Sequence, residues 1–130
     1  MHVFIGGAYN GKTAYVTQLL EEQEVALMNG VIPEVAPACD ALIIKNLEHW
    51  LIKQNLEEDE VIVKNIMAKL KILEESCQLY IIVTDVGRGV VPMEKQTRLL
   101  RDTCGRLYQA LFAEAKQVDR IWYGIAERIK

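Results

Sequence analysis

The chain has 130 residues, of which 51% are hydrophobic, and its 15 basic and 18 acidic residues leave a formal net charge of −3. A chain of this length can bury roughly two thirds of its unfolded surface, so one domain can form a core without disulfides or a structural metal. The acidic balance argues against a protein whose main task is to hold a phosphate backbone, and no apolar stretch approaches the roughly 20 residues that span a bilayer. We therefore expect a single cytoplasmic domain with neither nucleic acid nor a membrane as a partner.

Apolar residues along the chain follow patterns typical of alternating strands and helices. Runs typical of strands occupy residues 3–5, 25–28, 41–44, 79–83 and 121–123, and Gly124 follows the last of them. Helical spacing of apolar residues extends over 12–22, 47–53, 57–75 and 99–115. Two prolines predict an irregular segment from residue 30 to residue 40. The order predicts an α/β fold with a mainly parallel sheet that is flanked by helices.

The segment from Gly6 to Thr13 matches the phosphate-binding pattern G-x-x-x-x-G-K-[ST], and it follows a predicted strand and opens a predicted helix. In such a loop, backbone N–H groups turn toward phosphate oxygens, and the helix N-terminus adds partial positive charge. We predict a single P-loop NTPase-like nucleotide-binding domain over residues 1–130, with a chance match in a glycine-rich turn as the alternative. The predicted nucleotide-binding residues are Gly6, Gly7, Ala8, Tyr9, Asn10, Gly11, Lys12 and Thr13.

Two of these residues have predicted chemical roles. A P-loop enzyme usually also needs a carboxylate at the end of a neighbouring strand. Lys12 is expected to contact the β- and γ-phosphates of ATP or GTP, and Thr13 is expected to hold Mg²⁺. The strand at 41–44 is followed by Lys45-Asn46, which carries no carboxylate, whereas the strand at 79–83 is followed by Thr84 and then Asp85. Asp85 is therefore the candidate catalytic carboxylate, and a carboxylate that binds backbone N–H groups of its own turn is the alternative.

Several other residues have both a functional and a structural interpretation. Arg88, between two glycines, is a candidate phosphate contact, with a solvated loop arginine as the alternative. The three cysteines Cys39, Cys77 and Cys104 are odd in number and far apart in the sequence, which favours reduced thiols over a disulfide framework. Trp122 and the other aromatic residues are scattered along the chain, which favours core packing.

The loop and three later segments resemble the adenosylcobinamide kinase / adenosylcobinamide-phosphate guanylyltransferase family of cobalamin biosynthesis. Residues 83–92 are similar to the family's V-T-N-E-V-G-x-G-[IV]-V-P segment, with Asp85 in place of its Glu. Residues 101–109 are similar to its R-D-x-x-G-R-x-N-Q helix, with Tyr108 in place of Asn, and residues 124–130 are similar to its G-I-P-x-x-[IL]-K terminus. The family's third strand ends in Glu-Cys, where this chain has Lys45-Asn46.

This resemblance implies a two-step enzyme that assembles as a trimer. In the first step a nucleoside triphosphate phosphorylates the hydroxyl of adenosylcobinamide; Lys12 would stabilise the transferring group and Asp85 would orient or deprotonate the acceptor. In the second step GMP moves onto the new phosphate through a covalent histidine on a helix. The corresponding stretch here, residues 30–40, is too short for that helix and contains no histidine.

The chain contains only two histidines, and neither matches the family's nucleophile. His2 begins the first predicted strand, at the end away from the loop. His49 could approach a nucleotide, with a structural role beside Trp50 as the alternative. We therefore predict a kinase in which guanylyl transfer is absent or severely impaired. The alternative is a regulatory or interaction protein that binds nucleotide with little or no catalysis.

Overall fold

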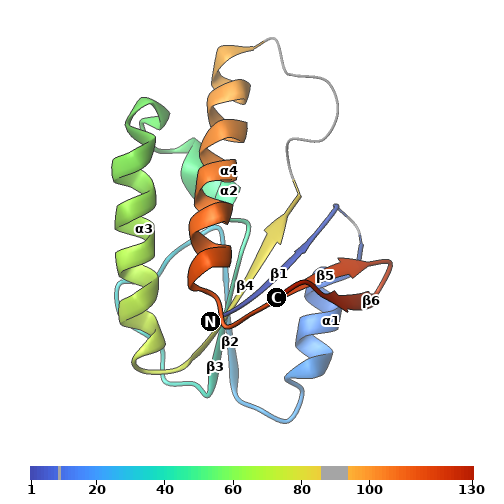
Figure 1. Ribbon diagram of the computed structural model, residues 1–130. Helices are drawn as coiled ribbons and strands as arrows, with labels where there is room; N and C mark the ends of the chain where they lie inside the picture. Colours follow the sequence, from blue (N-terminus) through green and yellow to red (C-terminus); the bar gives the residue numbers. More distant parts are fainter. Residues whose placement is uncertain (9, 86–93) are drawn as a thin grey trace.

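The computed structural model describes residues 1–8, 10–85 and 94–130. Over these residues the structure contains the helices and strands that the sequence predicts, and one further strand at the end of the chain (Figure 1). In chain order they are β1 (His2–Gly6), α1 (Lys12–Leu19), β2 (Val25–Asn29), β3 (Ala41–Lys45), α2 (Leu47–Ile52), the 3₁₀ helix η1 (Leu56–Glu58), α3 (Asp59–Glu74), β4 (Gln78–Thr84), α4 (Lys95–Glu114), β5 (Gln117–Trp122) and β6 (Ile125–Arg128). The predicted α/β class is confirmed, and residues 30–40 contain neither a helix nor a strand.

The strands form one six-stranded sheet in the order β2-β3-β4-β1-β5-β6. All neighbours pair in parallel except β6, which runs antiparallel to β5. The register places His2 beside Tyr80 and Gly6 beside Thr84, so that β1 and β4 end together. Because the carboxyl ends of the parallel strands meet at one edge, the loop after β1 and the loop after β4 leave the sheet side by side.

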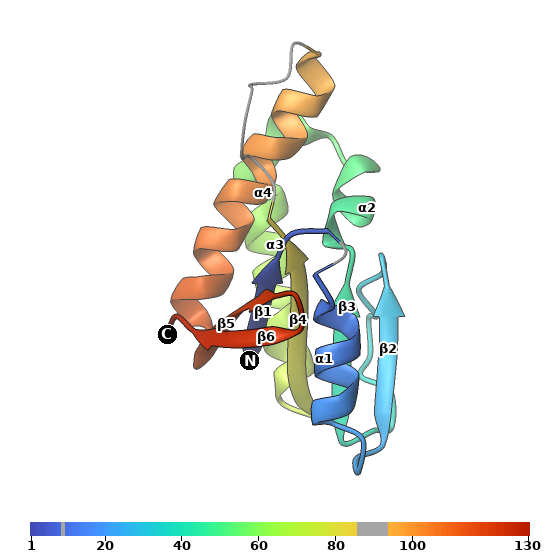
Figure 2. The same cartoon turned by 90° about the vertical axis from the view of Figure 1, so that its right-hand side faces the viewer.

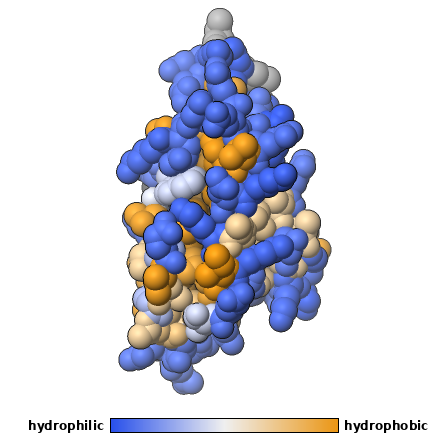
Figure 3. Space-filling model, turned by 90° about the vertical axis from the view of Figure 1, so that its left-hand side faces the viewer, coloured by the Kyte–Doolittle hydropathy of each residue, from blue (hydrophilic) through white to orange (hydrophobic). Residues whose placement is uncertain are grey.

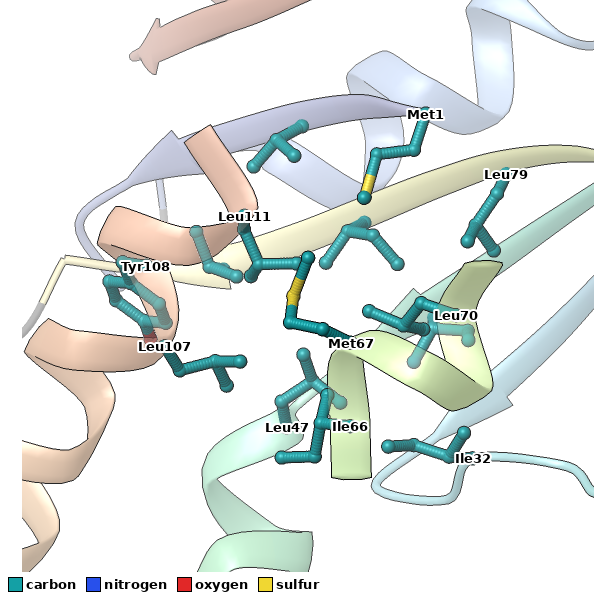
Figure 4. Close-up of a cluster of buried hydrophobic side chains, with 14 of the residues drawn as sticks. Met1, Ile32, Leu47, Ile66, Met67, Leu70, Leu79, Leu107, Tyr108 and Leu111 are labelled. Carbon is teal, nitrogen blue, oxygen red and sulfur yellow. The ribbon is translucent and has the colours of Figure 1, made fainter. Parts of the chain in front are cut away.

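Helix α1 covers one face of the sheet, and α2, α3 and α4 cover the other (Figures 1 and 2). Successive residues of a strand point to opposite faces. In β1, Val3 packs into the core beneath α3 and α4, whereas its neighbour Phe4 packs with Val16 of α1. Figure 4 shows the larger core, where Met67 of α3 and Leu111 of α4 meet above the sheet. The central strands are therefore buried on both faces, as their continuous apolar runs predict.

Two predictions about where elements end were wrong. Helix α1 ends at Leu19 rather than at Glu22, because the chain already turns there to reverse direction into β2. The sequence patterns place the last strand before Gly124, yet residues after it form β6. Tyr123 and Gly124 have φ values of 49° and 78°, which is the backbone of a two-residue hairpin turn that folds the chain back onto β5.

The same hairpin corrects the prediction that Trp122 packs in the core. Trp122 is 54% exposed and Tyr123 is 76% exposed. The two residues end β5 and begin its turn, where the preceding residue, Ile121, takes the buried side of the strand. Trp122 therefore points out of the core because residues alternate along a strand.

The remaining surface is mainly polar. Figure 3 shows a largely hydrophilic face with apolar side chains gathered over its middle and lower parts. Exposed apolar residues of α3 include Val61 and Ile72, which are 54% and 59% exposed. Within the described ranges, no helix combines the length and the apolar character needed to cross a membrane.

Candidate nucleotide-binding site

The glycine-rich loop leads from β1 into α1 at the carboxyl edge of the sheet; Tyr9 lies outside the described residues. Gly11 precedes α1 with φ 80°, a left-handed conformation that costs a residue with a Cβ about 1–2 kcal/mol. A Cβ at Gly6 would lie 2.4 Å from the carbonyl oxygen of Ile121 in β5. The loop therefore needs glycine at residue 11 for its conformation and at residue 6 for its contact with β5.

The hairpin between β5 and β6 lies against the loop. The Gly124 N–H donates a hydrogen bond of 2.9 Å to the carbonyl oxygen of Asn10. A cavity of about 140 Å³ is lined by Ile5, Gly6, Gly7, Asn10, Asp85, Arg120, Ile121 and Trp122. The sequence patterns did not predict this contact, although the Tyr123-Gly124 pair, a residue followed by glycine between two apolar stretches, is a recognisable turn signal.

Lys12 is the first residue of α1, and its side chain is folded back onto the loop. The residue is 8% exposed, and its Nζ donates a hydrogen bond of 2.7 Å to the carbonyl oxygen of Gly7. Burial lowers the pKa of Lys12, and the negative charge of Glu48 partly offsets this effect. The half-buried Thr13 follows in the same turn. No acidic side chain lies in the first turn of α1, so its N-terminal partial positive charge favours an anion at the loop.

Asp85 lies beside the loop, directly after β4. Its N–H donates a hydrogen bond of 2.9 Å to the carbonyl oxygen of Gly6, and the residue lines the small cavity next to Gly7. The structure therefore brings Asp85 and the predicted phosphate loop together at one edge of the sheet. Arg88, the candidate phosphate contact, lies outside the described residues.

A second carboxylate near Lys12 was missed by the sequence patterns. Glu48 lies in the first turn of α2, after Asn46 with φ 57° and ψ 45°. Its Oε2 is buried and accepts no hydrogen bond from any described residue. Its charge partly offsets the lowering of the Lys12 pKa by burial, and it adds to the raised pKa of two α4 residues, Cys104 and Tyr108. An asparagine, which tolerates the left-handed region, between a buried strand and a helical pattern was the available signal for this turn.

Two residues of α4 lie behind these charged groups. The Tyr108 hydroxyl donates a hydrogen bond of 2.8 Å to the carbonyl oxygen of Thr84 and so ties α4 to the end of β4. Burial raises the pKa of Tyr108, and interactions with Cys104, Glu48 and Asp85 raise it further. Burial, with a smaller effect of Glu48, raises the pKa of Cys104 to about 11. Both side chains are therefore neutral at neutral pH.

We expect the raised pKa of Cys104 to make stability depend on alkaline pH. The unfolded thiol ionises near its ordinary value of 9.0, whereas the folded thiol stays protonated up to about 11. Stabilisation is therefore complete below pH 9 and is lost as the pH rises through 11, because the unfolded state releases its proton first. Urea unfolding at pH 8 and at pH 10.5 measures this loss, which should be smaller in Cys104→Ala. An equal loss in both proteins would contradict the assignment.

The opposite edge of the sheet holds His2 and two of the cysteines. His2 hydrogen-bonds to the side chain of Asp119 and stacks on Phe4, with ring centroids 4.1 Å apart. Cys77 Sγ donates a hydrogen bond of 3.5 Å to the carbonyl oxygen of Leu73, and burial, with a smaller effect of the nearby Cys39, raises the pKa of Cys77. Both cysteines line a cavity of about 690 Å³ together with His2. These groups lie at the amino ends of the strands and do not contribute to the loop site.

The histidine of α2 lies at the carboxyl edge of the sheet. His49 is exposed, and a Cβ at Gly30, just after β2, would lie 3.1 Å from the His49 Cβ. The His49 N–H donates a hydrogen bond of 3.0 Å to the carbonyl oxygen of Asn46 in the turn that opens α2. His49 is therefore an exposed residue whose Cβ lies close to Gly30, and it does not belong to the core.

The sheet order and the loop between β1 and α1 define an α/β protein with a P-loop-like fold. The sequence model of the cobinamide kinase / cobinamide phosphate guanyltransferase family matches residues 20–129. The chain belongs to this family, and the resemblance seen in its motifs is confirmed. Membership implies a cobinamide kinase or guanylyltransferase role in cobalamin biosynthesis, with nucleoside triphosphate as a substrate. The matched span begins after the loop at 6–13, and no curated protein matches the chain.

Proposed function

We propose that this chain is a single nucleotide-binding domain that transfers the γ-phosphoryl group of ATP or GTP to the hydroxyl of adenosylcobinamide. The observation that carries the proposal is the buried Lys12 at the start of α1, a helix with no acidic side chain in its first turn. A helix N-terminus of this kind favours a phosphate anion. Membership of a cobinamide kinase family supports the choice of acceptor.

The loop residues and Asp85 have distinct roles in the proposed reaction. Phosphate oxygens take the place of the Gly7 carbonyl as acceptors for Lys12 Nζ, so the ammonium stabilises negative charge on the transferring group. The Thr13 hydroxyl holds Mg²⁺, which when bound neutralises charge on the triphosphate. Asp85 orients the acceptor hydroxyl and takes its proton as the oxygen attacks phosphorus. The product is a phosphate ester and a nucleoside diphosphate.

The kinase reaction is tested by incubating the protein with adenosylcobinamide and with ATP or GTP labelled in the γ-phosphate. We expect labelled adenosylcobinamide phosphate, separated from nucleotide by chromatography. Calorimetry with a nonhydrolysable analogue measures binding alone in the same preparation. Tight analogue binding without product would instead support the regulatory protein without catalysis, an alternative favoured by the missing carboxylate at the end of β3, where Lys45 stands.

We expect no covalent guanylyl intermediate to form. This expectation is supported by the irregular segment 30–40, which contains no histidine, and by the pairing of His2 with Asp119 at the opposite edge. GTP labelled in the α-phosphate should leave no label on the protein after denaturation in alkali, which preserves phosphoramidates. Label that remains in the wild type and disappears in His49→Ala would overturn this part of the proposal.

We also expect a homotrimer, as the resemblance implies. The hairpin next to the loop exposes Trp122, Tyr123 and Ile125, the last of which is 71% exposed. Apolar side chains of this size are suited to burial against a neighbouring subunit. A subunit docked on this hairpin would lie close to Asn10 of the loop.

A further inference from the structure

Glu48 is a half-buried acidic residue in the first turn of α2. Its Oε2 is buried and lacks a hydrogen-bond partner in the described part of the chain. Taking an ionised carboxylate out of water is costly unless donors or a cation replace the lost water. A buried polar atom of this kind therefore calls for an explanation, such as a catalytic role or a bound ion.

Lys12 does not satisfy this oxygen directly. Lys12 Nζ donates to the Gly7 carbonyl at 2.7 Å, while the effect of Glu48 on Lys12 is an electrostatic interaction through space. Two opposite charges in this arrangement can both be satisfied by a ligand that carries charges of both signs. A triphosphate with its divalent cation is such a ligand, since its phosphate oxygens suit the ammonium and its cation suits the carboxylate.

The turn between β3 and α2 explains why the carboxylate comes from Glu48. β3 ends at Lys45, and the left-handed Asn46 turns the chain directly into α2. The side-chain nitrogen of Asn46 donates a hydrogen bond of 2.5 Å to the side-chain oxygen of Asn29, which ties this turn to the end of β2. The first helical turn after β3 thus supplies the acidic side chain that the end of the strand lacks.

We propose that Glu48 binds the divalent cation that accompanies the nucleoside triphosphate, together with the hydroxyl of Thr13. Among the described residues no three His, Cys, Asp or Glu side chains form a metal cluster. Mg²⁺ in nucleotide sites keeps several waters and takes one or two carboxylates, so a cluster is not required. The inference rests on the proposed function, because the cation arrives with the nucleotide.

The test compares nucleotide binding with and without the cation. Calorimetry with nonhydrolysable ATP and GTP analogues, in excess MgCl₂ or in excess EDTA, gives affinities for the wild type and for Glu48→Gln. We expect Mg²⁺ to strengthen nucleotide binding by the wild type. In Glu48→Gln this Mg²⁺-dependent increase in affinity should be smaller by about 10- to 100-fold. In EDTA the variant should bind as well as the wild type or better, because a negative charge near the phosphates is gone.

A matched control and a direct metal readout keep the outcomes distinct. Glu60→Gln removes the same charge from an exposed residue in the first turn of α3 and should behave as the wild type. Electron paramagnetic resonance of Mn²⁺ should show tight binding to the wild-type nucleotide complex and weak binding to that of Glu48→Gln. An unchanged gain from Mg²⁺ in Glu48→Gln would overturn the cation site alone. A wild type that binds neither analogue in either buffer would overturn the proposed function as well.

Discussion

Replacing Lys12 by methionine is expected to lower phosphoryl transfer to adenosylcobinamide by about 10²-fold or more, with little effect on stability. The ammonium is the buried positive charge of the loop, and removing a preorganised donor of this kind typically costs that much in rate. Stability should change by no more than about 1 kcal/mol, because the hydrogen bond to Gly7 is lost while the desolvation that lowers the pKa of Lys12 is relieved. Initial rates and urea unfolding measure the two quantities.

Lys64→Met is the matched control, because it makes the same substitution at an exposed residue of α3. This variant should retain wild-type rates and wild-type affinity for the nucleotide. Equal rates of phosphoryl transfer in Lys12→Met and in the wild type would show that Lys12 takes no part in the reaction. A large loss of stability in Lys12→Met would instead show that the lysine mainly supports the fold.

Replacing Gly6 by alanine is expected to destabilise the protein and to weaken nucleotide binding together. The added Cβ would lie 2.4 Å from the carbonyl oxygen of Ile121, and this atom belongs to the backbone of β5, which cannot rotate away. Overpacking of this kind costs about 1–3 kcal/mol. The strain falls between β1 and β5, where the loop begins, so the loop should shift with it. Urea unfolding and calorimetry with a nonhydrolysable nucleotide analogue measure the two effects.

Gly105→Ala makes the same substitution in the middle of α4. A Cβ at Gly105 would meet no described atom within 4 Å, and alanine is favoured over glycine in a helix by about 0.5–1 kcal/mol. This variant should therefore be more stable than the wild type. If Gly6→Ala were as stable as Gly105→Ala, the close approach of β5 to Gly6 would be wrong.

The parts of the candidate site that could be predicted are those encoded by neighbouring residues. The run Val3–Ile5 and the glycines after it predict a strand that enters a tight turn, and the structure has both. Asp85 could be singled out because it follows an apolar run, which places it at a strand end. The proximity of Asp85 to the loop also follows from a general property of parallel sheets, whose carboxyl ends share an edge.

The sequence by itself thus determined the α/β class, the family and the loop, because strand and helix periods and short motifs are local properties of the chain. The tertiary structure alone decided that Glu48 acts on Lys12, that the β5–β6 hairpin holds Asn10 and that Ile121 restricts residue 6 to glycine. Each of these interactions joins residues far apart in the sequence. They exist because the sheet places β5 directly beside β1 and places β3, which leads into Glu48, one strand beyond β4, an order set by the packing of whole strands and helices.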